Sequence, residues 1–294
     1  MEKTYISQLF VEENTTVTVD IEPAISIDHT NRLTVGIQSL RRALGITQMR
    51  PMDAGKSVKL YKVVKENTPE QVAEGETIPL TKITRKKVGE IVMKLKKYRK
   101  QTTAEAIQED GYENSINVTD EKLLAEVRKD IKTDFFTTIQ GGSGTAEAGD
   151  TLQAACANLW GALQVYYEDM DVVPIFFIHP TDVADYLGGA QITTQNAFGI
   201  SYIQDFLGMG NAFITTGVEA KHPEATVTQN LNGVFVPAGG AVGQAFGLTY
   251  DATGLVGMKH YTADSEASLN TLIMTGVKFY AEDATGVFKG TIGE

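Results

Sequence analysis

The fold is decided by the stretch that reads SVKLYKVVKEN at 57–67, TPEQVAEGETIP at 68–79 and ITRKKVGEIVMKLKKYRK at 83–100. Ile91, Met93 and Leu95 alternate with Val92 and Lys94, which is the period-two pattern of a strand with one buried face. The turn between the two runs is polar and charged. We therefore expect one long two-stranded hairpin. Because isolated hairpins are marginally stable in water, this one is predicted to lie on another molecule.

A long amphipathic helix is predicted to close this stretch at 119–140. Its apolar residues recur every three or four positions, as on one helical stripe: Leu124, Val127, Ile131, Phe135 and Ile139. Thr119, Asp120 and Glu121 supply an N-terminal cap and favourable first-turn charge, and Gly141-Gly142 is a good stop. At about 1.5 Å per residue, the helix is a rod of roughly 30 Å.

Composition indicates a globular chain with ample core. Its 294 residues allow one large or two medium domains, 42% are hydrophobic, and no apolar run is long enough for a membrane span. The net charge of −11 is unevenly distributed: residues 1–133 hold 22 Lys and Arg and 20 Asp and Glu, and residues 134–294 hold 4 and 17. This asymmetry predicts an acidic surface and a region of charge pairing, and argues against nucleic-acid binding through the second half.

Outside the hairpin and helix, the chain divides into an arm, a junction and an α/β layer. Residues 1–29 are interpreted as an arm, and residues 30–45 as a helix with a buried stripe of Leu33, Ile37, Leu40 and Leu44. GGSGTAEAGD at 141–150 is read as a flexible domain boundary. A helix at 151–169, a buried strand at 172–180 and a short helix capped by Thr181 and Asp182 follow. From Gly217 onward the chain is glycine-rich and favours strands.

The sequence gives no positive support for an enzyme, and we predict no catalytic, cofactor-binding or metal site. GGSGTAEAGD lacks the Gly-Lys-Ser/Thr ending of a phosphate loop. The four histidines have no metal-ligand spacing, and a structural role is favoured for them: His29, His179, His222 and His260. The single cysteine, Cys156, lies among alanines and is interpreted as a small buried apolar residue. A small-molecule enzyme with an α/β domain is kept as an alternative from another class.

The basic run at 82–100 has three interpretations. It could bind nucleic acid, form a solvated strand face, or meet acidic residues of a neighbouring copy. The third is favoured because Tyr98 is the only aromatic residue in the run and the rest of the chain is strongly acidic.

The order of these parts resembles the tailed-phage major capsid protein of the Hong Kong 97-type fold, over about 30–292. Local echoes are Glu74-Gly75-Glu76 before Pro79, a long helix followed by GGSG, and a strand ending in His-Pro within IFFIHPTDVADYL. The resemblance implies an α+β fold with an N-terminal arm, an extended E-loop hairpin, a peripheral domain with a long spine helix, and an α/β axial domain. The ranges it implies are 1–29 for the arm, 30–56 for the N-terminal helix and connector, 57–100 for the E-loop, 101–149 for the spine-helix part of the peripheral domain, 150–260 for the axial domain and 261–294 for the return strands.

The resemblance also implies which residues contact a neighbouring subunit and which form a hinge. We predict that the E-loop contacts a neighbouring subunit through Lys62, Lys65, Glu74, Glu76, Lys82, Arg85, Lys86 and Lys87. We predict a hinge at Gly141, Gly142 and Gly144, which would let one sequence fit hexamers and pentamers. Some members of the family begin with a scaffolding segment, for which the early helix at 30–45 leaves no room. Some members weld subunits by a Lys–Asn bond, which we do not predict here because no partner asparagine can be assigned.

The function that the resemblance implies is that of a major capsid protein of a tailed double-stranded DNA phage. Its partners would be other copies of itself, a portal protein, and a separate scaffolding or decoration protein. It would enclose DNA without reading its sequence, bind no membrane or cofactor, and be assembled in the host bacterial cytoplasm into the virion. The alternative within the same fold is an encapsulin-like nanocompartment that encloses a cargo enzyme, and the content of the particle distinguishes the two.

Overall fold

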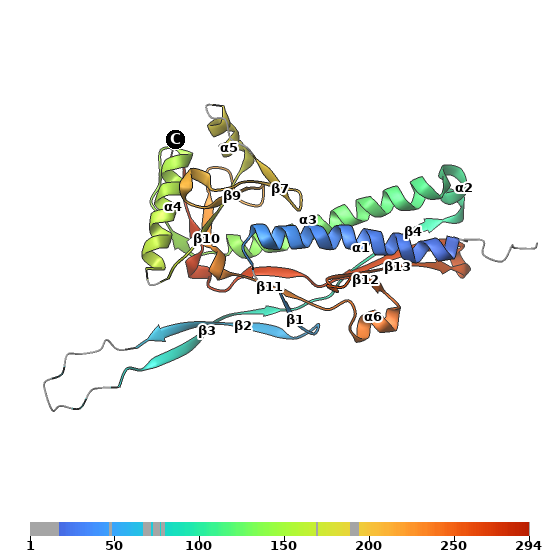
Figure 1. The fold of residues 1–294 in the computed structure, drawn as a ribbon, viewed down its shortest axis with the longest axis horizontal. Coiled ribbons are helices and arrows are strands. Elements are labelled where there is room, and N and C mark those ends of the chain that lie inside the picture. The colour runs from blue at the N-terminus through green and yellow to red at the C-terminus, as the bar shows by residue number, and fades with distance from the viewer. Residues whose placement is uncertain are drawn as a thin grey trace, which may run out of the picture.

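The computed structural model describes residues 18–46, 49–66, 72, 77, 80–168, 170–188 and 194–293. Within these residues the strands form four β-sheets, and two long helices lie along one side of the body (Figure 1). One of the sheets is a hairpin that projects from the body at its lower left in Figure 1.

The first long helix, α1 (Thr18–Ala43), runs alongside the second, α3 (Thr119–Gln140) (Figure 1). The predicted stripes of both helices are buried in one core, which confirms the period of three to four in each. Two shorter segments lead into α3: α2 (Ala104–Tyr112) and a π-helical turn (Glu113–Val118). Gly111 has a φ of 78° and kinks this run, a conformation that glycine adopts at little cost.

A four-stranded sheet lies against α1 and α3. Its strand order is β12 (Thr249–Tyr250), β13 (Val256–Ala263), β14 (Ser268–Thr275) and β4 (Lys96–Thr103), and its neighbouring strands are antiparallel. Met258 and Ile273 from this sheet share the core with the stripes of the two helices.

A seven-stranded mixed sheet forms the α/β part of the molecule. Its order is β5 (Gly144–Thr145), β16 (Phe288–Lys289), β10 (Glu224–Val227), β6 (Pro174–Ile178), β9 (Asn211–Ile214), β8 (Ile200–Ile203) and β7 (Gln195–Ala197). Helices α4 (Leu152–Tyr166) and α5 (Pro180–Leu187) accompany it. Every residue of β6 is buried, as the continuous apolar run predicts.

A three-stranded sheet joins these units. It has the order β1 (Met49–Pro51), β11 (Leu231–Phe235) and β15 (Lys278–Ala281), with β1 parallel to β11. In the described ranges the remaining helices are α6 (Ala241–Phe246) and four 3-10 turns, at Phe206–Gly208, Thr228–Asn230, Asp264–Glu266 and Ala284–Gly286. The hairpin consists of β2 (Ser57–Lys65) and β3 (Ile83–Val92).

The return run of the hairpin was predicted too long. It forms two strands in different sheets, β3 in the hairpin and β4 against β14. Met93 separates them: it is buried at the base of the hairpin, and its backbone N–H donates to Lys56 O at 2.9 Å. The period-two pattern continues on both sides of Met93, and such a pattern fixes which face is buried but not which strand is the partner.

The N-terminal arm was also predicted too long, because residues 18–29 belong to α1. Their alternating Val and Ile residues favour a strand, and Pro23 is a poor interior helix residue. Pro23 nevertheless falls near the start of α1, where the N–H that it lacks removes only one early hydrogen bond. The rest of the predicted arm lies outside the described residues.

Two predicted helix caps differ from the structure. Helix α3 continues directly from the π-helical turn, so Thr119 does not cap it and donates instead to Ser115 O at 2.7 Å. Helix α5 is capped by His179, whose Nδ1 accepts from Thr181 N, and it has Pro180 at its first turn. Asp182, predicted as the cap, is buried and accepts from Lys221 N at 2.9 Å.

Candidate intersubunit surface

The hairpin is attached to the body at its root. Strands β2 and β3 are antiparallel from Ser57↔Val92 to Lys65↔Ile83, and a bulge between Leu60 and Tyr61 adds one residue to β3. At the root, Val58, Leu60 and Ile91 pack against a small core. The buried members of that core are Met93, Val234, Val236 and Tyr280. The root is therefore part of the folded chain, whereas the outer part extends away from the body (Figure 1).

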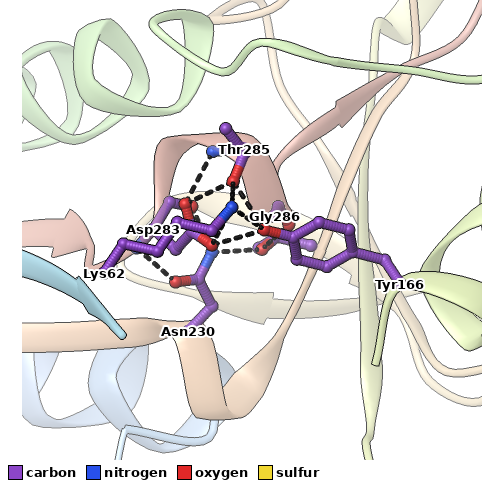
Figure 2. A network of polar contacts seen from close by, with 7 residues as sticks. Lys62, Tyr166, Asn230, Asp283, Thr285 and Gly286 are labelled. Carbon is purple, nitrogen blue, oxygen red and sulfur yellow. Dashed lines mark hydrogen bonds and ion pairs between the residues drawn. The ribbon is translucent and has the colours of Figure 1, made fainter. Parts of the chain in front are cut away.

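Lys62 fixes the hairpin to the α/β part of the molecule. Its Nζ donates to Tyr166 Oη and to Thr285 Oγ1, each at 3.0 Å, and lies 4.0 Å from Asp283 Oδ2. Tyr166 Oη in turn donates to Asp283 Oδ2 at 2.6 Å. Figure 2 shows these side chains converging from β2, α4 and the segment after β15.

Asn230 holds Asp283 in place from below this cluster (Figure 2). Its Oδ1 accepts from Asp283 N at 2.7 Å, and its Nδ2 donates to Asp283 O at 2.9 Å. The Asp283 carboxylate also accepts from Thr285 N at 2.9 Å. The two bonds from Asn230 hold the Asp283 backbone, and the bond from Thr285 N holds its carboxylate. The carboxylate is therefore positioned independently of Lys62.

The charges in this cluster stabilise one another. The hydrogen bond to Tyr166 and the charge of Asp283 raise the pKa of Lys62, and they outweigh the opposing effect of burial. Burial on its own would raise the pKa of Asp283, but hydrogen bonds from Thr285 and Tyr166 and the charge of Lys62 lower it. Both groups are therefore held in their charged forms.

The other predicted contact residues that the structure describes lie on the outer part of the hairpin, which is called the exposed ribbon below: Lys82, Arg85, Lys86 and Lys87. Lys82 pairs with Glu66 at 2.7 Å, and the Arg85 guanidinium lies 5.0 Å from the centre of the Tyr61 ring. Lys87 pairs with Glu90. Lys86 is exposed on β3, opposite Lys62. Such exposed pairs contribute little to stability, about 0–1 kcal/mol each.

Of the other predicted contact residues, Lys65 ends β2, and Glu74 and Glu76 lie outside the described residues. The intersubunit role of all eight residues stays a prediction. What the structure adds is that Lys62 is bound within its own chain.

Apolar side chains are also exposed along the ribbon and next to it. Leu80 is 91% exposed and Ile83 is 64% exposed, and Val88 and Val92 are about half exposed. A two-stranded hairpin that leaves this much apolar surface in water is marginal on its own. The exposed ribbon therefore presents apolar as well as charged side chains to solvent.

The glycine-rich junction is packed against its neighbours. Gly144 lies in β5, which pairs with β16 in parallel. A Cβ on Gly142 would lie 2.6 Å from the Val287 side chain, and one on Gly144 would lie 2.9 Å from Phe288. Gly142 and Gly144 are thus required by close packing. The hinge at Gly141, Gly142 and Gly144 stays a prediction, since it concerns a difference between copies.

A buried polar cluster at the start of α3 was missed by the sequence analysis. The fully buried Asp120 carboxylate contacts His260 Nε2 at 2.6 Å, Thr271 Oγ1 at 2.8 Å and Lys100 Nζ at 2.5 Å. Burial alone would raise the pKa of Asp120, but the hydrogen bonds and charges of His260 and Lys100 lower it. Lys100, predicted to belong to the hairpin, thus forms an ion pair with the buried Asp120. No local pattern brings these distant residues together, so only the tertiary fold reveals the cluster.

The described part of the chain contains no group of three or more His, Cys, Asp or Glu side chains placed to hold a metal ion. Cys156 is fully buried, and burial raises the pKa of its thiol to about 12, so it is a poor nucleophile near neutral pH. None of the helices within the described ranges is both long and apolar enough to span a membrane.

Comparison with known proteins finds similarity among solved structures. No protein-family model matches the chain, and no curated protein matches it. Among solved structures, the SrpI encapsulin of Synechococcus elongatus PCC 7942 aligns with a TM-score of 0.54 at 10% identity, over 85% of this chain and 86% of that chain. The capsid of Myoviridae phage XM1 aligns with a TM-score of 0.53 at 10% identity, over 90% and 92%.

A chain from Mycobacterium phage Patience aligns with a TM-score of 0.52 at 10% identity, over 96% of this chain and 93% of that chain. At this level of identity the similarity establishes a shared fold. It confirms the fold that the order of elements in the sequence predicts.

Proposed function

We propose that this chain, which has the Hong Kong 97-type fold, is the subunit of a closed icosahedral shell that assembles from many copies of itself. The role of the chain would be structural, as part of the wall of a container. The observation that carries the proposal is the hairpin. Lys62 anchors it to the body, and its outer part exposes charged and apolar side chains.

The mechanism is geometric. The hairpin of one subunit would lie over the next, which is a head-to-tail contact, and head-to-tail contacts close into rings when the rotation between copies allows it. The α/β part, predicted at 150–260, would pack around each symmetry axis of hexamers and pentamers. The spine helix α3 and the four-stranded sheet would meet neighbours at the periphery. Each contact can be modest because a shell repeats it many times.

The contacts of Lys62 support this mechanism because they orient the hairpin relative to the body. Lys62, Tyr166 and Asp283 connect the hairpin to α4 and to the segment after β15, so the hairpin leaves the body at a fixed angle. A contact surface held on a fixed support loses less conformational entropy on binding than a free loop does. The exposed ribbon can therefore meet a neighbour in one geometry.

The finer proposal is that the shell is the head of a tailed phage and encloses double-stranded DNA. The acidic second half of the chain, with 17 acidic and 4 basic residues, supports it, because an acidic inner surface would repel phosphates and let DNA be packed without sticking. The partners would then be other copies, a portal protein, and a scaffolding or decoration protein. The encapsulin-like alternative is supported by the similarity in fold to an encapsulin.

Electron microscopy of the purified protein tests the proposal. We expect closed particles of uniform size, and a small discrete oligomer as the only species would overturn it. The content of the particles separates the two finer functions. Nuclease-resistant DNA, with absorbance dominated by 260 nm, supports a phage head, whereas a co-purifying enzyme in DNA-free particles supports a cargo compartment.

A further inference from the structure

A cavity of about 490 Å³ lies in the corner between α3 and the seven-stranded sheet. The C-terminal half of α3 forms one wall, and the segments around β8, β9 and the start of α5 form the other (Figure 1). Among the described residues, none from the hairpin or its anchor lines this cavity. Cavities of this size are typical of sites for small ligands.

The lining of the cavity carries positive charge without a carboxylate to balance it. Among the described residues it includes Lys129 and Lys132 and no Asp or Glu, although the chain as a whole has a net charge of −11. Neither lysine makes an ion pair with another described residue. Glu126, one turn before Lys129 on α3, is exposed and lies outside the lining. Because like charges so close on one helix repel, the cavity favours an anion.

Two carboxylates further along α3 do not relieve these charges, because they are engaged on another side of the helix. Asp134 pairs with Lys96 on β4 at 2.8 Å, and Asp130 accepts from Tyr98 Oη at 2.7 Å. The helix thus directs both carboxylates toward the four-stranded sheet and leaves its two lysines at the cavity.

Lys132 reaches across the cavity and is held there at a cost. A Cβ built on Gly199, in the turn between β7 and β8, would lie 3.8 Å from Lys132 Nζ. Burial and the charge of Arg128 both lower the pKa of Lys132. The Nε of Arg128, one turn earlier on α3, is buried and has no hydrogen-bond partner within the described ranges. An anion beside these groups would stabilise their charged forms.

Thr215, which follows β9, adds a buried hydroxyl group to the lining. Its Oγ1 accepts from Gly217 N at 3.0 Å, and its hydroxyl hydrogen is donated to no other described residue. The hydroxyl of Thr137, on the facing helix, is different because it already donates to Thr133 O at 2.8 Å. Thr215 and the two lysines therefore offer donors to one acceptor-rich group, and a phosphate has several acceptor oxygens.

We infer that this cavity binds the phosphate group of a small organic ligand, with Lys129, Lys132 and Thr215 donating to the phosphate oxygens. Pro180 and Ile214, which line the cavity and are partly exposed, would contact the carbon part of the ligand. A single chain forms this cavity, so the inference goes beyond the shell function and does not depend on it. Free nucleotides and the backbone of a nucleic acid both carry phosphate, and competition between them distinguishes the two sources.

Labelling with pyridoxal phosphate tests the site in the wild-type protein. Its aldehyde condenses with an unprotonated lysine amine to an imine with loss of water, and borohydride reduces the imine to a stable secondary amine that peptide mapping locates. Lys129 and Lys132 together should react about tenfold faster than Lys122, which is exposed on α3 outside the lining. Pyridoxal, which lacks the phosphate, should show no such preference, and adenosine monophosphate should protect the two lysines.

Two outcomes of the labelling would overturn the inference. Equal labelling of Lys122 and of the cavity lysines would show that the phosphate is not recognised. Protection by a thymidine oligonucleotide but not by adenosine monophosphate would assign the lysines to a nucleic-acid backbone instead of a small ligand.

Calorimetric titration of the full-length chain with adenosine monophosphate provides a second test. Thr215→Val should weaken binding about tenfold, because it removes a hydrogen bond to a charged group. Thr215→Ser keeps the hydroxyl and should bind like the wild type. Thr137→Val is the matched control and should also bind like the wild type, because the Thr137 hydroxyl is already used within α3. Melting curves check that each variant is folded. Equal affinities for Thr215→Val and Thr137→Val, or no binding to the wild type, would overturn the inference and leave the shell function intact.

Discussion

Lys62 Nζ donates a hydrogen bond of 3.0 Å to Tyr166 Oη, although 104 residues separate the two in sequence. Lys62 lies on the hairpin and Tyr166 ends α4, so this bond joins the projecting ribbon to the α/β part of the molecule. Asp283 completes the contact by accepting from Tyr166 Oη at 2.6 Å. The direction of the hairpin thus depends on these three side chains, from three distant segments, as well as on the apolar packing at its root.

Removing the Lys62 amine should loosen the hairpin. We expect Lys62→Met to lower the free energy of unfolding by about 1–2 kcal/mol, because hydrogen bonds to charged groups contribute about 1.5–3 kcal/mol and this one is partly exposed to water. Amide hydrogen exchange in β2 and β3 should become faster. Lys86→Met on the exposed ribbon is the matched control and should change neither quantity. Unchanged exchange in the Lys62 variant would show that the anchor does not hold the ribbon.

The long elements were predictable from sequence because their pattern is internal to each of them. The stripe from Leu124 to Ile139 locates α3, and the continuous apolar run locates β6, without knowledge of any partner. Packing of these elements follows from burial of one face or of both. The glycine pair after Gln140 also ends the helix where expected.

The contacts between distant segments were not predictable in this way. Lys100 was assigned to the hairpin because it continues a basic run, yet it contacts the buried Asp120. The anchor of the hairpin likewise depends on Asp283, which is distant from Lys62 in sequence. Charge and period describe one segment at a time, whereas these contacts are set by how sheets are joined.

Glu224 should make the stability of the subunit fall as pH rises toward neutrality. Its buried carboxyl has a pKa raised by burial from 4.5 to about 7, with Lys289 Nζ 4.0 Å away. Between these values the folded state binds more protons than the unfolded state, so stability is lost as pH rises from about 4.5 through about 7. At about 1.4 kcal/mol per pKa unit, the loss is on the order of 3 kcal/mol.

Glu224→Gln removes this titration, and urea unfolding of unassembled subunits at pH 5 and pH 8 measures it. The free energy of unfolding of the variant, relative to that of the wild type, should be higher at pH 8 than at pH 5. The exposed Glu219→Gln serves as the control and should follow the wild type. A Glu224→Gln variant with the same pH dependence as the wild type would contradict the assignment.

Asp120 should be among the most sensitive positions in the core. Asp120→Ala leaves Lys100 and His260 without the carboxylate that both contact, and a buried charge that loses its partner costs about 3–5 kcal/mol. Thr271→Val removes one hydrogen bond to the same carboxylate and should cost only about 1–2 kcal/mol. Thermal and urea unfolding of both variants provide the comparison. Equal losses would mean that the charges do not depend on Asp120.

Two glycine substitutions should have opposite effects. A Cβ at Gly142 would lie 2.6 Å from the Val287 side chain and 2.8 Å from Val287 O, so Gly142→Ala forces the junction away from β16 and should lower stability. Gly161 lies inside α4 with nothing within 4 Å of such a Cβ, so Gly161→Ala should raise stability by about 0.5–1 kcal/mol. Melting temperatures decide both. A neutral Gly142→Ala would favour a pliable junction over a packed one.

The exposed cations of β3 should act on assembly more than on folding. Lys86 has an exposed side chain, and Lys87 makes only an exposed pair with Glu90, so reversing both charges removes little from the isolated subunit. If they meet acidic residues of a neighbour, Lys86→Gln with Lys87→Gln should raise the concentration required for assembly, and Lys86→Glu with Lys87→Glu should raise it further. Added salt should narrow the difference, because exposed charges are screened over about 10 Å at 0.1 M. Light scattering across a salt series measures the assembly threshold, and melting curves confirm that the variants are folded. A threshold that is independent of both charge and salt would assign the ribbon's contact energy to its exposed apolar side chains, Ile83 and Val88, rather than to its lysines.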